Sequence, residues 1–583
     1  MLKKTLSVLL CALMLLSFLT TTSFAYYDDA DDLVTLPEMT GMMKEVVPVT
    51  SDRLPEDAPY TPMRSRTVIQ RPPEPENSYL YDQLSLPRQK LYYFFLTLAH
   101  NKLCGEGYYL WDYRTEPDPV SDKYYSVAQV CGIEEDVTAE DVQLVFEIFY
   151  RNEPEYFWLA NSYLCTEYTD DTVAYVGIFS YYYTVPFYHQ GVPMTYGNYD
   201  EAVISDMQLE IDTVLASPLN TAAGYTDKQA VRYIYDWIIT RGTYRHYDFT
   251  NQDECIANRD AHSIYGIVSS KLSAVCEGYA KLFNYMLSRC GIEAYIVSGY
   301  SQSSLHEITD AILHAWSIVR LDGKWYEFDV TWDDIESAGK QYYFYFFFAI
   351  ETEVMNRFSH MRSVVDPATL APTPYVTLLP VAESISIANE FIIDYSLDFR
   401  DDPVETERYL YRYKGPGGIL YIPEGYVGIS KNAIVNQTTN NNMHPVVICV
   451  VPEGVTDIKD GAFRRCNRLE AIYLPSTLDS SGLNGDEFYY DYGTPALRRI
   501  YGLKSSYAEA YASVYSSTYG VQCLFRPMGD ADDDAVLTVL DAVIIAEAIA
   551  DGLTPAELFA GDASLSAVLD GGDLAVVLSR IWN

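Results

Sequence analysis

A cysteine, a histidine and an aspartate occur in that order along the chain, each inside a short motif suited to chemistry. Cys276 lies in the sequence Val-Cys-Glu-Gly-Tyr-Ala, His314 begins the sequence His-Ala-Trp, and Asp329 lies in Phe-Asp-Val-Thr-Trp-Asp. A thiol becomes a strong nucleophile when a nearby base takes its proton, and a carboxylate can orient that base. The order therefore predicts a nucleophile at Cys276, a base at His314 and an orienting carboxylate at Asp329.

The residues that follow Cys276 have the apolar spacing of a helix that begins at the cysteine. Apolar side chains recur on one face over 276–289, and Gly291 follows as a stop signal. The N-terminus of a helix carries unpaired amides and the positive end of the macrodipole, which lower the pKa of a thiol and can hold an oxyanion. A second amphipathic helix is predicted at 227–241.

Three β-rich segments follow this helix at 294–297, 314–321 and 324–329. The Asp-Gly pair at 322–323 separates the last two and is typical of a tight hairpin turn. We therefore expect adjacent antiparallel strands that place His314 and Asp329 side by side, facing Cys276.

Residues 228–360 resemble a transglutaminase-like cysteine domain of the papain-like fold group. The resemblance rests on the three motifs in the family's order, together with Tyr-Gly at 265–266 and Gly-Lys-Trp-Tyr at 323–326. It implies that Cys276 is the nucleophile, that His314 takes and returns its proton, and that Asp329 orients the imidazole. It also implies a contribution of Tyr265 to the oxyanion site.

Each of these residues also has an ordinary structural interpretation. A buried cysteine at a helix start is usually a small hydrophobe, and a lone histidine or aspartate in a strand is usually a satisfied polar group. Three motifs in order favour the triad, but they leave open whether it turns over. The other histidines of this region show no metal-ligand spacing, so surface or capping roles are expected for most of them and a structural role for His360: His246, His262, His306 and His360.

Composition limits the classes of partner. The chain has 583 residues, with 81 acidic and 40 basic side chains, which gives a net charge of −41. Such a charge repels phosphate backbones and anionic bilayers, so nucleic acid is not expected as a partner. The 53 tyrosines fit ordinary strands and would also suit stacking on sugars or peptides.

The N-terminal residues predict export. Two lysines at positions 3 and 4 precede an apolar run over 6–19, and Ser-Phe-Ala at 23–25 provides small residues for cleavage, as in a secretory signal peptide. No other stretch reaches the roughly 18 to 20 apolar residues of a membrane span. We therefore expect a secreted, extracellular protein without a membrane span.

Two further patterns follow the catalytic motifs. Strand-like runs at 413–425, 446–458 and 469–475 share a Pro-Glu-Gly or Leu-Pro ending and resemble the leucine-rich repeats of bacterial surface proteins. Such an array serves either as a ligand-binding surface or as a spacer, and the sequence favours neither.

The last segment contains a duplicated loop followed by a helix. Ligand types suited to calcium occupy positions 1, 3, 5 and 12 of each loop: Asp530, Asp532, Asp534 and Asp541, then Asp562, Ser564, Ser566 and Asp573. The duplication resembles a type I dockerin, which attaches an exported enzyme to the cohesin domain of a scaffold protein. Alanine replaces the expected glycine at position 6 of both loops, and the alternative interpretation is an acidic, solvated tail.

These patterns predict a multidomain protein with an α+β papain-like (transglutaminase-like) core. The expected domain plan is a signal peptide at 1–25, a disordered or loosely packed lead-in at 26–78, an N-terminal α+β block at 79–204, a transglutaminase-like catalytic domain at 205–365, a linker at 366–405, a leucine-rich repeat β array at 406–526 and an α dockerin-like pair of calcium loop-helix units at 527–583.

The leading functional hypothesis is cysteine acyl transfer on a peptide or protein substrate, by hydrolysis or by crosslinking, without a catalytic cofactor. Calcium is expected only as a structural ion, a cohesin-bearing, cellulosome-like scaffold as the partner, and polysaccharide as an indirect association. The alternatives are a non-catalytic adhesin or scaffold component with a vestigial triad, and direct carbohydrate binding by tyrosine-rich surfaces.

Overall fold

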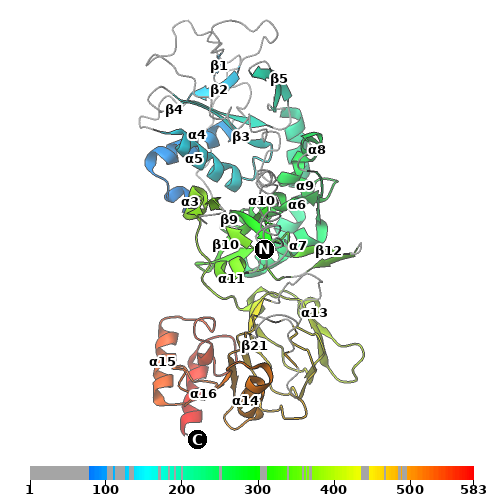
Figure 1. Ribbon diagram of the computed structural model, residues 1–583, viewed down its shortest axis with the longest axis vertical. Coiled ribbons are helices and arrows are strands. Elements are labelled where there is room, and N and C mark those ends of the chain that lie inside the picture. The colour runs from blue at the N-terminus through cyan, green and yellow to red at the C-terminus, as the bar shows by residue number, and fades with distance from the viewer. Residues whose placement is uncertain are drawn as a thin grey trace, which may run out of the picture.

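The computed structural model describes residues 78–582 with internal gaps. The gaps are 101–108, 112–124, 130–136, 168–172, 181–183, 190–191, 198–200, 249–251, 303–310, 338–339, 344, 358–359, 363, 367–370, 435–444, 465, 467, 484–486 and 489–495. The signal peptide, nearly all of the lead-in and His306 lie outside the described residues. Figure 1 shows helices of the N-terminal block above the central domain, with the repeat region and the C-terminal helices below it.

Two helices of the N-terminal block pack against each other, α4 (Leu86–His100) and α5 (Ala139–Asn152). Thr138 begins α5 with a capping box, because its hydroxyl accepts from the Asp141 amide and the Asp141 carboxylate accepts from the Thr138 amide. A four-stranded sheet accompanies the helices, in the order β1 (Tyr109–Trp111), β2 (Tyr125–Gln129), β4 (Val173–Ser180) and β3 (Leu159–Glu167).

The central domain packs helices against an antiparallel sheet. The helices include α6 (Glu201–Ala222), α7 (Asp227–Arg241) and α10 (Cys276–Ser288), and the last two begin where the sequence predicts. The sheet has the order β11 (Lys324–Phe328), β10 (Ala311–Leu321), β9 (Ala294–Gln302) and β14 (His360–Arg362). The expected antiparallel pairing of 314–321 with 324–329 is therefore present, with Leu321 opposite Lys324 at the hairpin.

A glycine lets the edge strand β14 approach the sheet. Gly299 of β9 lies opposite His314 of β10 and opposite Arg362 of β14. A Cβ added there would lie 2.3 Å from the Met361 carbonyl oxygen and 2.4 Å from the Trp316 ring. The absence of a side chain at this position therefore allows the tryptophan and β14 to pack closely.

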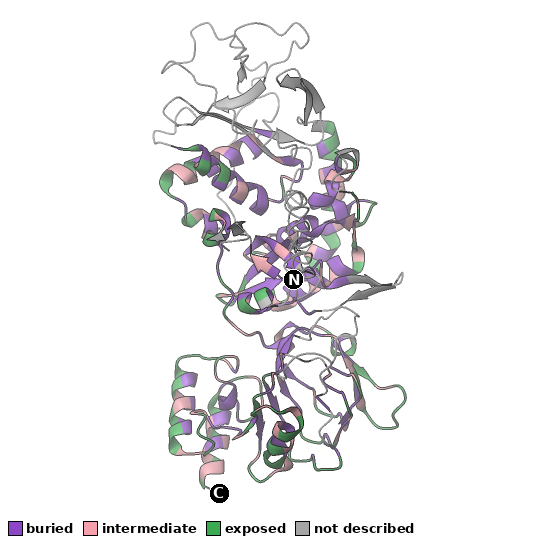
Figure 2. Ribbon diagram, viewed as in Figure 1, coloured by how far each residue is buried: buried purple, intermediate pink, exposed green. Residues whose placement is uncertain are grey.

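The N-terminal block and the central domain share one hydrophobic core rather than two. Buried side chains from Leu80 to Phe391 form a single cluster, which appears as buried ribbon across both units in Figure 2. Asn152, at the end of α5, accepts a hydrogen bond from the Ile296 amide of β9 at 3.1 Å. The stretch 366–405, which the sequence predicts to be a linker, contributes buried Tyr375 and Phe391 to this core.

The repeat region consists of successive parallel strands. One sheet has the order β19 (Gly418–Tyr421), β21 (Val446–Val450), β23 (Ala471–Tyr473), β24 (Arg499–Gly502) and β25 (Leu524–Pro527), with every pair parallel. The three predicted strand repeats therefore lie side by side. Helix α14 (Tyr507–Tyr519) packs against β24 and β25.

A buried arginine joins the central domain to the segment that leads into the repeats. Arg232 of α7 is 2% exposed, and its Nη2 lies 2.5 Å from Asp398 Oδ1 on α13 (Tyr395–Asp398). Its Nε lies 3.1 Å from Asp236, and the guanidinium stacks 3.7 Å from the Tyr345 ring centroid. Both carboxylates and the ring are therefore organised around one cation.

The C-terminal module contains helices α15 (Val539–Ala550) and α16 (Gly571–Trp582), which pack together. Figure 1 shows them beside the repeat region. Phe559 and Ala560, which precede the second loop, pack in one cluster with Tyr421 and Tyr473 of the repeat sheet. Among the described helices, none combines the length and the apolar composition that a membrane crossing needs.

Candidate active site

Helix α10 presents Cys276 at its first position. The N-cap residue Val275 has no side-chain acceptor for the first-turn amides, and its own amide donates to the Ala261 carbonyl at 3.2 Å. Gly278 makes this contact possible, because a Cβ there would lie 2.1 Å from the Ala261 carbonyl oxygen. The first turn of α10 therefore packs closely against Ala261. The positive end of the helix dipole lies at Cys276 and favours negative charge there.

Cys276 packs against the strand that carries His314. The thiol residue is 1% exposed and shares a small cluster with Ala280 of α10, Ile296 of β9 and Ala315 of β10. The cysteine thus lies in the same buried cluster as the residue that directly follows His314. It is one of six free cysteines among the described residues.

His314 and Asp329 form a buried hydrogen-bonded pair. The distance from His314 Nε2 to Asp329 Oδ2 is 2.6 Å, and the two residues are 6% and 0% exposed. The other carboxylate oxygen accepts from the Thr331 amide at 2.8 Å and from the Trp332 amide at 3.1 Å. Burial alone would raise the pKa of Asp329, but His314 and His360 outweigh it and hold this pKa well below its usual range.

His360 also bonds to the same carboxylate, a contact that no sequence pattern predicts. Its Nε2 lies 2.7 Å from Asp329 Oδ2, and the residue is 0% exposed. The ring is surrounded by aromatic rings, with centroids at 4.6 Å for Phe347, 4.9 Å for Trp332 and 5.2 Å for Trp316. Only the fold could reveal this contact, because β14 reaches Asp329 through its pairing with β9.

The hydroxyl of Tyr265 is engaged elsewhere. It donates to Glu210 of α6 at 2.5 Å, and its pKa is raised to about 12 by burial and by this acidic partner. The hydrogen of this hydroxyl is therefore given to Glu210 rather than to an oxyanion. The contribution of Tyr265 to catalysis stays a prediction.

A second group of polar side chains adjoins the nucleophile. Glu277, next to Cys276, accepts from His262 Nδ1 at 3.0 Å and pairs with Lys281 one turn later on α10. The other nitrogen of His262 lies 2.6 Å from the Tyr247 hydroxyl. Burial opposes ionisation, yet Lys281 and His262 lower the pKa of Glu277 to about 2. His262 is thus a buried partner of an ionised carboxylate, and it departs from the surface or capping role expected of most histidines in this region.

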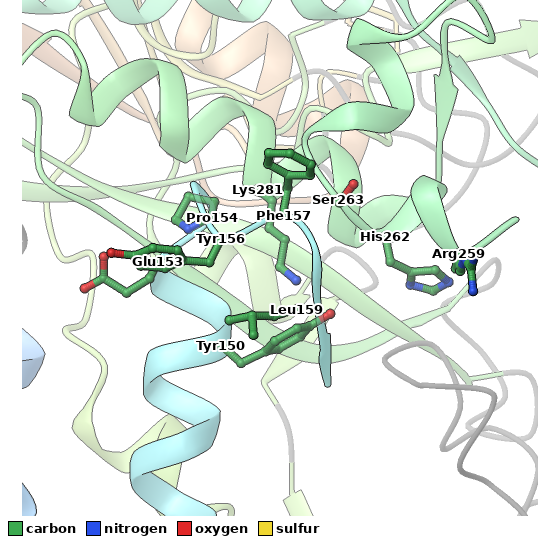
Figure 3. A pocket seen from close by; sticks show the side chains of 10 residues that line it. All are labelled: Tyr150, Glu153, Pro154, Tyr156, Phe157, Leu159, Arg259, His262, Ser263 and Lys281. Carbon is green, nitrogen blue, oxygen red and sulfur yellow. The ribbon is translucent and has the colours of Figure 1, made fainter. Parts of the chain in front are cut away.

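A small pocket lies where this group meets the N-terminal block (Figure 3). It encloses about 10 Å³, enough for roughly one water molecule. Its aromatic wall comes from the end of α5 and the residues that follow it, and the Lys281 ammonium lies 3.5 Å from the Tyr150 ring centroid. The pocket therefore belongs to the seam between the two units and is too small for a substrate side chain.

Among the described residues, two groups of ionisable side chains bring possible ligand atoms within 4.8 Å of one another: His314, Asp329 and His360, and Asp530, Asp532 and Asp541. In the first group the nitrogen-to-oxygen distances of 2.6 and 2.7 Å are those of hydrogen bonds. Two ligand atoms bound at about 2 Å to one tetrahedral zinc ion would lie farther apart. The first group is therefore a proton-sharing cluster.

The acidic loop of the C-terminal module fits a hard cation. Asp530 and Asp541 are 2% and 0% exposed, and the carboxylate of Asp530 accepts the amides of Asp534 and Ala535. Burial, together with the nearby charge of Asp541, raises the pKa of Asp530. A bound cation would neutralise the charge on these buried carboxylate oxygens, and carboxylate oxygens are the ligands that calcium prefers. Asp534 is not among the three residues whose oxygens converge.

The second loop repeats the backbone of the first. Positions 4 and 6 have positive φ in both loops, at 61° and 71° for Asp533 and Ala535 and at 59° and 64° for Leu565 and Ala567. The alanines thus adopt the left-handed conformation expected of glycine there. The first ligand position of the second loop, Asp562, accepts a hydrogen bond from the Tyr421 hydroxyl of the repeat sheet. Burial raises the pKa of Asp562 to about 6.

Residues 216–330 match the model of the transglutaminase-like superfamily. Among curated proteins, the chain is 30% identical to kyphoscoliosis peptidase of Homo sapiens over 126 residues, which cover 21% of this chain and 18% of the human protein. It is 29% identical to the Mus musculus protein over 112 residues, which cover 18% and 16% of the two chains. The chain therefore spans less than a fifth of the length of these relatives.

Similarity to solved structures is limited to short segments. A crystal structure of a TGase shares 15% identity, with a TM-score of 0.16, over 25% of this chain and 44% of that chain. The periplasmic domain of TgpA from Pseudomonas aeruginosa, bound to ethylmercury, shares 18% identity, with a TM-score of 0.12, over 18% and 45% of the two chains. The family model carries the assignment: residues 216–330 form the α/β core of a transglutaminase-like domain.

Proposed function

We propose that this protein is a secreted cysteine enzyme that transfers acyl groups from peptide or protein amides. The observation that carries the proposal is the buried pair of His314 on β10 and Asp329 just after β11, next to the helix that begins with Cys276. A helix start, an imidazole and an ionised carboxylate are the parts that activate a thiol.

The proposed reaction has two stages. His314 takes the Cys276 proton, the sulfur attacks the amide carbonyl, and the C–N bond breaks as the imidazolium returns the proton to the leaving amine. First-turn amides of α10 are suited to bind the oxyanion. Water then hydrolyses the acyl-enzyme, or another amine takes the acyl group. We favour hydrolysis, because kyphoscoliosis peptidase, which the chain resembles over 126 residues, is named as a peptidase.

The proposal predicts that Cys276→Ala abolishes the reaction. The wild type and the variant would be incubated with a mixed protein substrate, and new N-termini and new isopeptide bonds would be read by mass spectrometry. We expect one class of product with the wild type and a loss of about 10³-fold or more with the variant, because no other group replaces the nucleophile.

Cys290→Ala is the matched control, because Cys290 lies just after the same helix and is only partly buried. It should retain wild-type activity. Equal product yields from the wild type and Cys276→Ala would contradict an enzymatic role and favour the alternative of an adhesin or scaffold component with a vestigial triad.

The C-terminal module supports a second part of the proposal, attachment as a dockerin to a cohesin domain of an extracellular scaffold. One face of α15 leaves large apolar side chains exposed: Val539 at 56%, Leu540 at 55% and Val543 at 45%. The green and purple sides of this helix are visible in Figure 2. Exposed apolar patches of this kind mark interaction sites. Association with polysaccharide would then be indirect, through the scaffold.

Calcium is expected to stabilise the C-terminal module. Asp530, Asp532 and Asp541 would hold the ion in the first loop, and Asp562 and Asp573 would contribute in the second. At a calcium concentration 100-fold above its Kd, binding adds about 2.7 kcal/mol. Scanning calorimetry with and without chelator should therefore show a calcium-dependent transition in the wild type that Asp541→Ala loses.

Glu547→Ala provides the control for this experiment, because Glu547 is exposed on the same helix and lies outside the loop. It should respond to calcium as the wild type does. A wild-type thermogram that is identical with calcium and with chelator would remove the calcium assignment.

A further inference from the structure

Asp329 receives four hydrogen bonds, two on each carboxylate oxygen. Oδ1 accepts the amides of Thr331 and Trp332, and Oδ2 accepts Nε2 of both His314 and His360. A carboxylate has about four acceptor positions, so this one is fully used. Because an ionised carboxylate cannot donate, both imidazoles must carry hydrogen on Nε2.

This arrangement fixes the tautomer of His314. With its Nε2 hydrogen committed to Asp329, the remaining nitrogen, Nδ1, is the atom that can exchange a proton with Cys276. His360 bonds to the same oxygen, so it competes with His314 for the negative charge of that atom. The second imidazole therefore weakens the acceptor that would stabilise a charged His314.

Packing alone gives no reason for a histidine at position 360. The ring is 0% exposed inside a cage of Phe347, Trp332 and Trp316. An apolar side chain would fill such a cage without the cost of burying polar nitrogens. The polar atom directed at Asp329 is thus the feature that distinguishes His360 from a core residue.

We infer that His360 is a positioning residue for the Cys276–His314 pair: by donating to Asp329 Oδ2, it holds the carboxylate in place and shares the oxygen that accepts from His314. This inference rests on the proposed function. Without the donor, Asp329 would be a stronger partner for the His314 imidazolium, and the thiolate–imidazolium pair would form at lower pH.

Other charges around His360 are already paired or lie at the surface. Glu327 of β11 accepts from Trp316 Nε1 and from Arg362 of β14 at 2.7 Å. Asp333 accepts from Tyr235, and Glu353 of α11 (Thr352–Arg357) is exposed. Within the part of the chain that the structure describes, these contacts leave Asp329, His314, His360 and Cys276 as the titratable groups of the cluster.

The test follows the thiolate of Cys276 by its ultraviolet absorbance, measured as the difference between each protein and its Cys276→Ala counterpart across pH. In His360→Phe, which fills the cage without a donor, the midpoint should fall by about 0.5 to 1 pH unit. In His360→Gln, whose amide can donate to Asp329 Oδ2, it should stay at the wild-type value. On a cleaved substrate, kcat/KM should fall about 10-fold to 100-fold in His360→Phe, with partial rescue in His360→Gln.

Two results separate the inference from the proposed function. A wild-type midpoint in the ordinary thiol range would overturn the proposed function. A low wild-type midpoint that is unchanged in His360→Phe would overturn only the role of His360. If His360→Phe fails to fold, His360→Met replaces it, because the flexible methionine fills the same cage without an N–H donor.

Discussion

Asp329→Asn should lower kcat/KM by about 10⁴-fold, as loss of the orienting carboxylate does in serine-protease triads. The amide oxygen must stay on the Thr331 and Trp332 amides, so the NH₂ group would face both imidazoles. His314 would then have to present a bare Nε2 and carry its hydrogen on Nδ1. That tautomer cannot accept the proton of Cys276. Steady-state kinetics on a substrate cleaved by the wild type measures the loss.

Asp333→Asn is a matched control for this prediction. Asp333 is also fully buried, and it accepts from the Tyr235 hydroxyl at 2.6 Å and the Phe346 amide at 2.9 Å. Burial raises the pKa of Asp333 well above its usual range, so asparagine resembles the protonated acid. This variant should keep activity within about tenfold of the wild type. Equal losses in both variants would indicate damage to the fold rather than to the tautomer.

Arg232→Met should cost about 3 to 5 kcal/mol of unfolding free energy, because it leaves the buried Asp398 without its cation. The guanidinium also stacks on Tyr345 and bonds to Asp236, so packing is lost as well. Burial raises the pKa of Asp398 and Arg232 opposes that effect, so removal of Arg232 favours the protonated acid. The loss should therefore be smaller in acid, where Asp398 buries no charge. Urea unfolding monitored at several pH values measures both effects.

The double variant Arg232→Met with Asp398→Leu tests the cause of this loss. Replacing both members of a buried ion pair by apolar groups is often nearly neutral. The double variant should therefore recover at least half of the stability lost in Arg232→Met. No recovery would mean that the stacking on Tyr345, rather than the uncompensated charge, accounts for the effect.

Local patterns in the sequence predicted the parts of the site that local structure determines. The start of α10 at Cys276 follows from apolar spacing, and the β10–β11 hairpin follows from Asp-Gly at 322–323. Ala535 and Ala567 have the positive φ expected at position 6 of each loop, although neither residue is the glycine that usually occupies it.

Contacts between segments that are distant in the sequence could not be predicted from local patterns. The bond of His360 to Asp329 depends on the pairing of β14 with β9. The bond of His262 to Glu277 joins a short 3-10 helix (Arg259–His262) to α10, and no sequence periodicity relates the two. The hydroxyl of Tyr265 meets Glu210 only because α6 packs against α9 (Tyr265–Val268). The core that the N-terminal block shares with the central domain likewise depends on tertiary packing, which composition does not predict.

The C-terminal module contacts the hairpin that carries the candidate site. Lys324 lies at the β10–β11 turn, and its ammonium is 2.9 Å from Glu557, between the two loops of the module. Arg580 of α16 donates to the Met528 carbonyl at 2.7 Å, and Tyr421 bonds to Asp562. If a scaffold protein binds at α15 as proposed, these contacts would hold Cys276 in a fixed orientation relative to the scaffold. The distance over which the thiol can meet an immobile substrate would then be set by the size of the folded protein rather than by the length of a flexible linker.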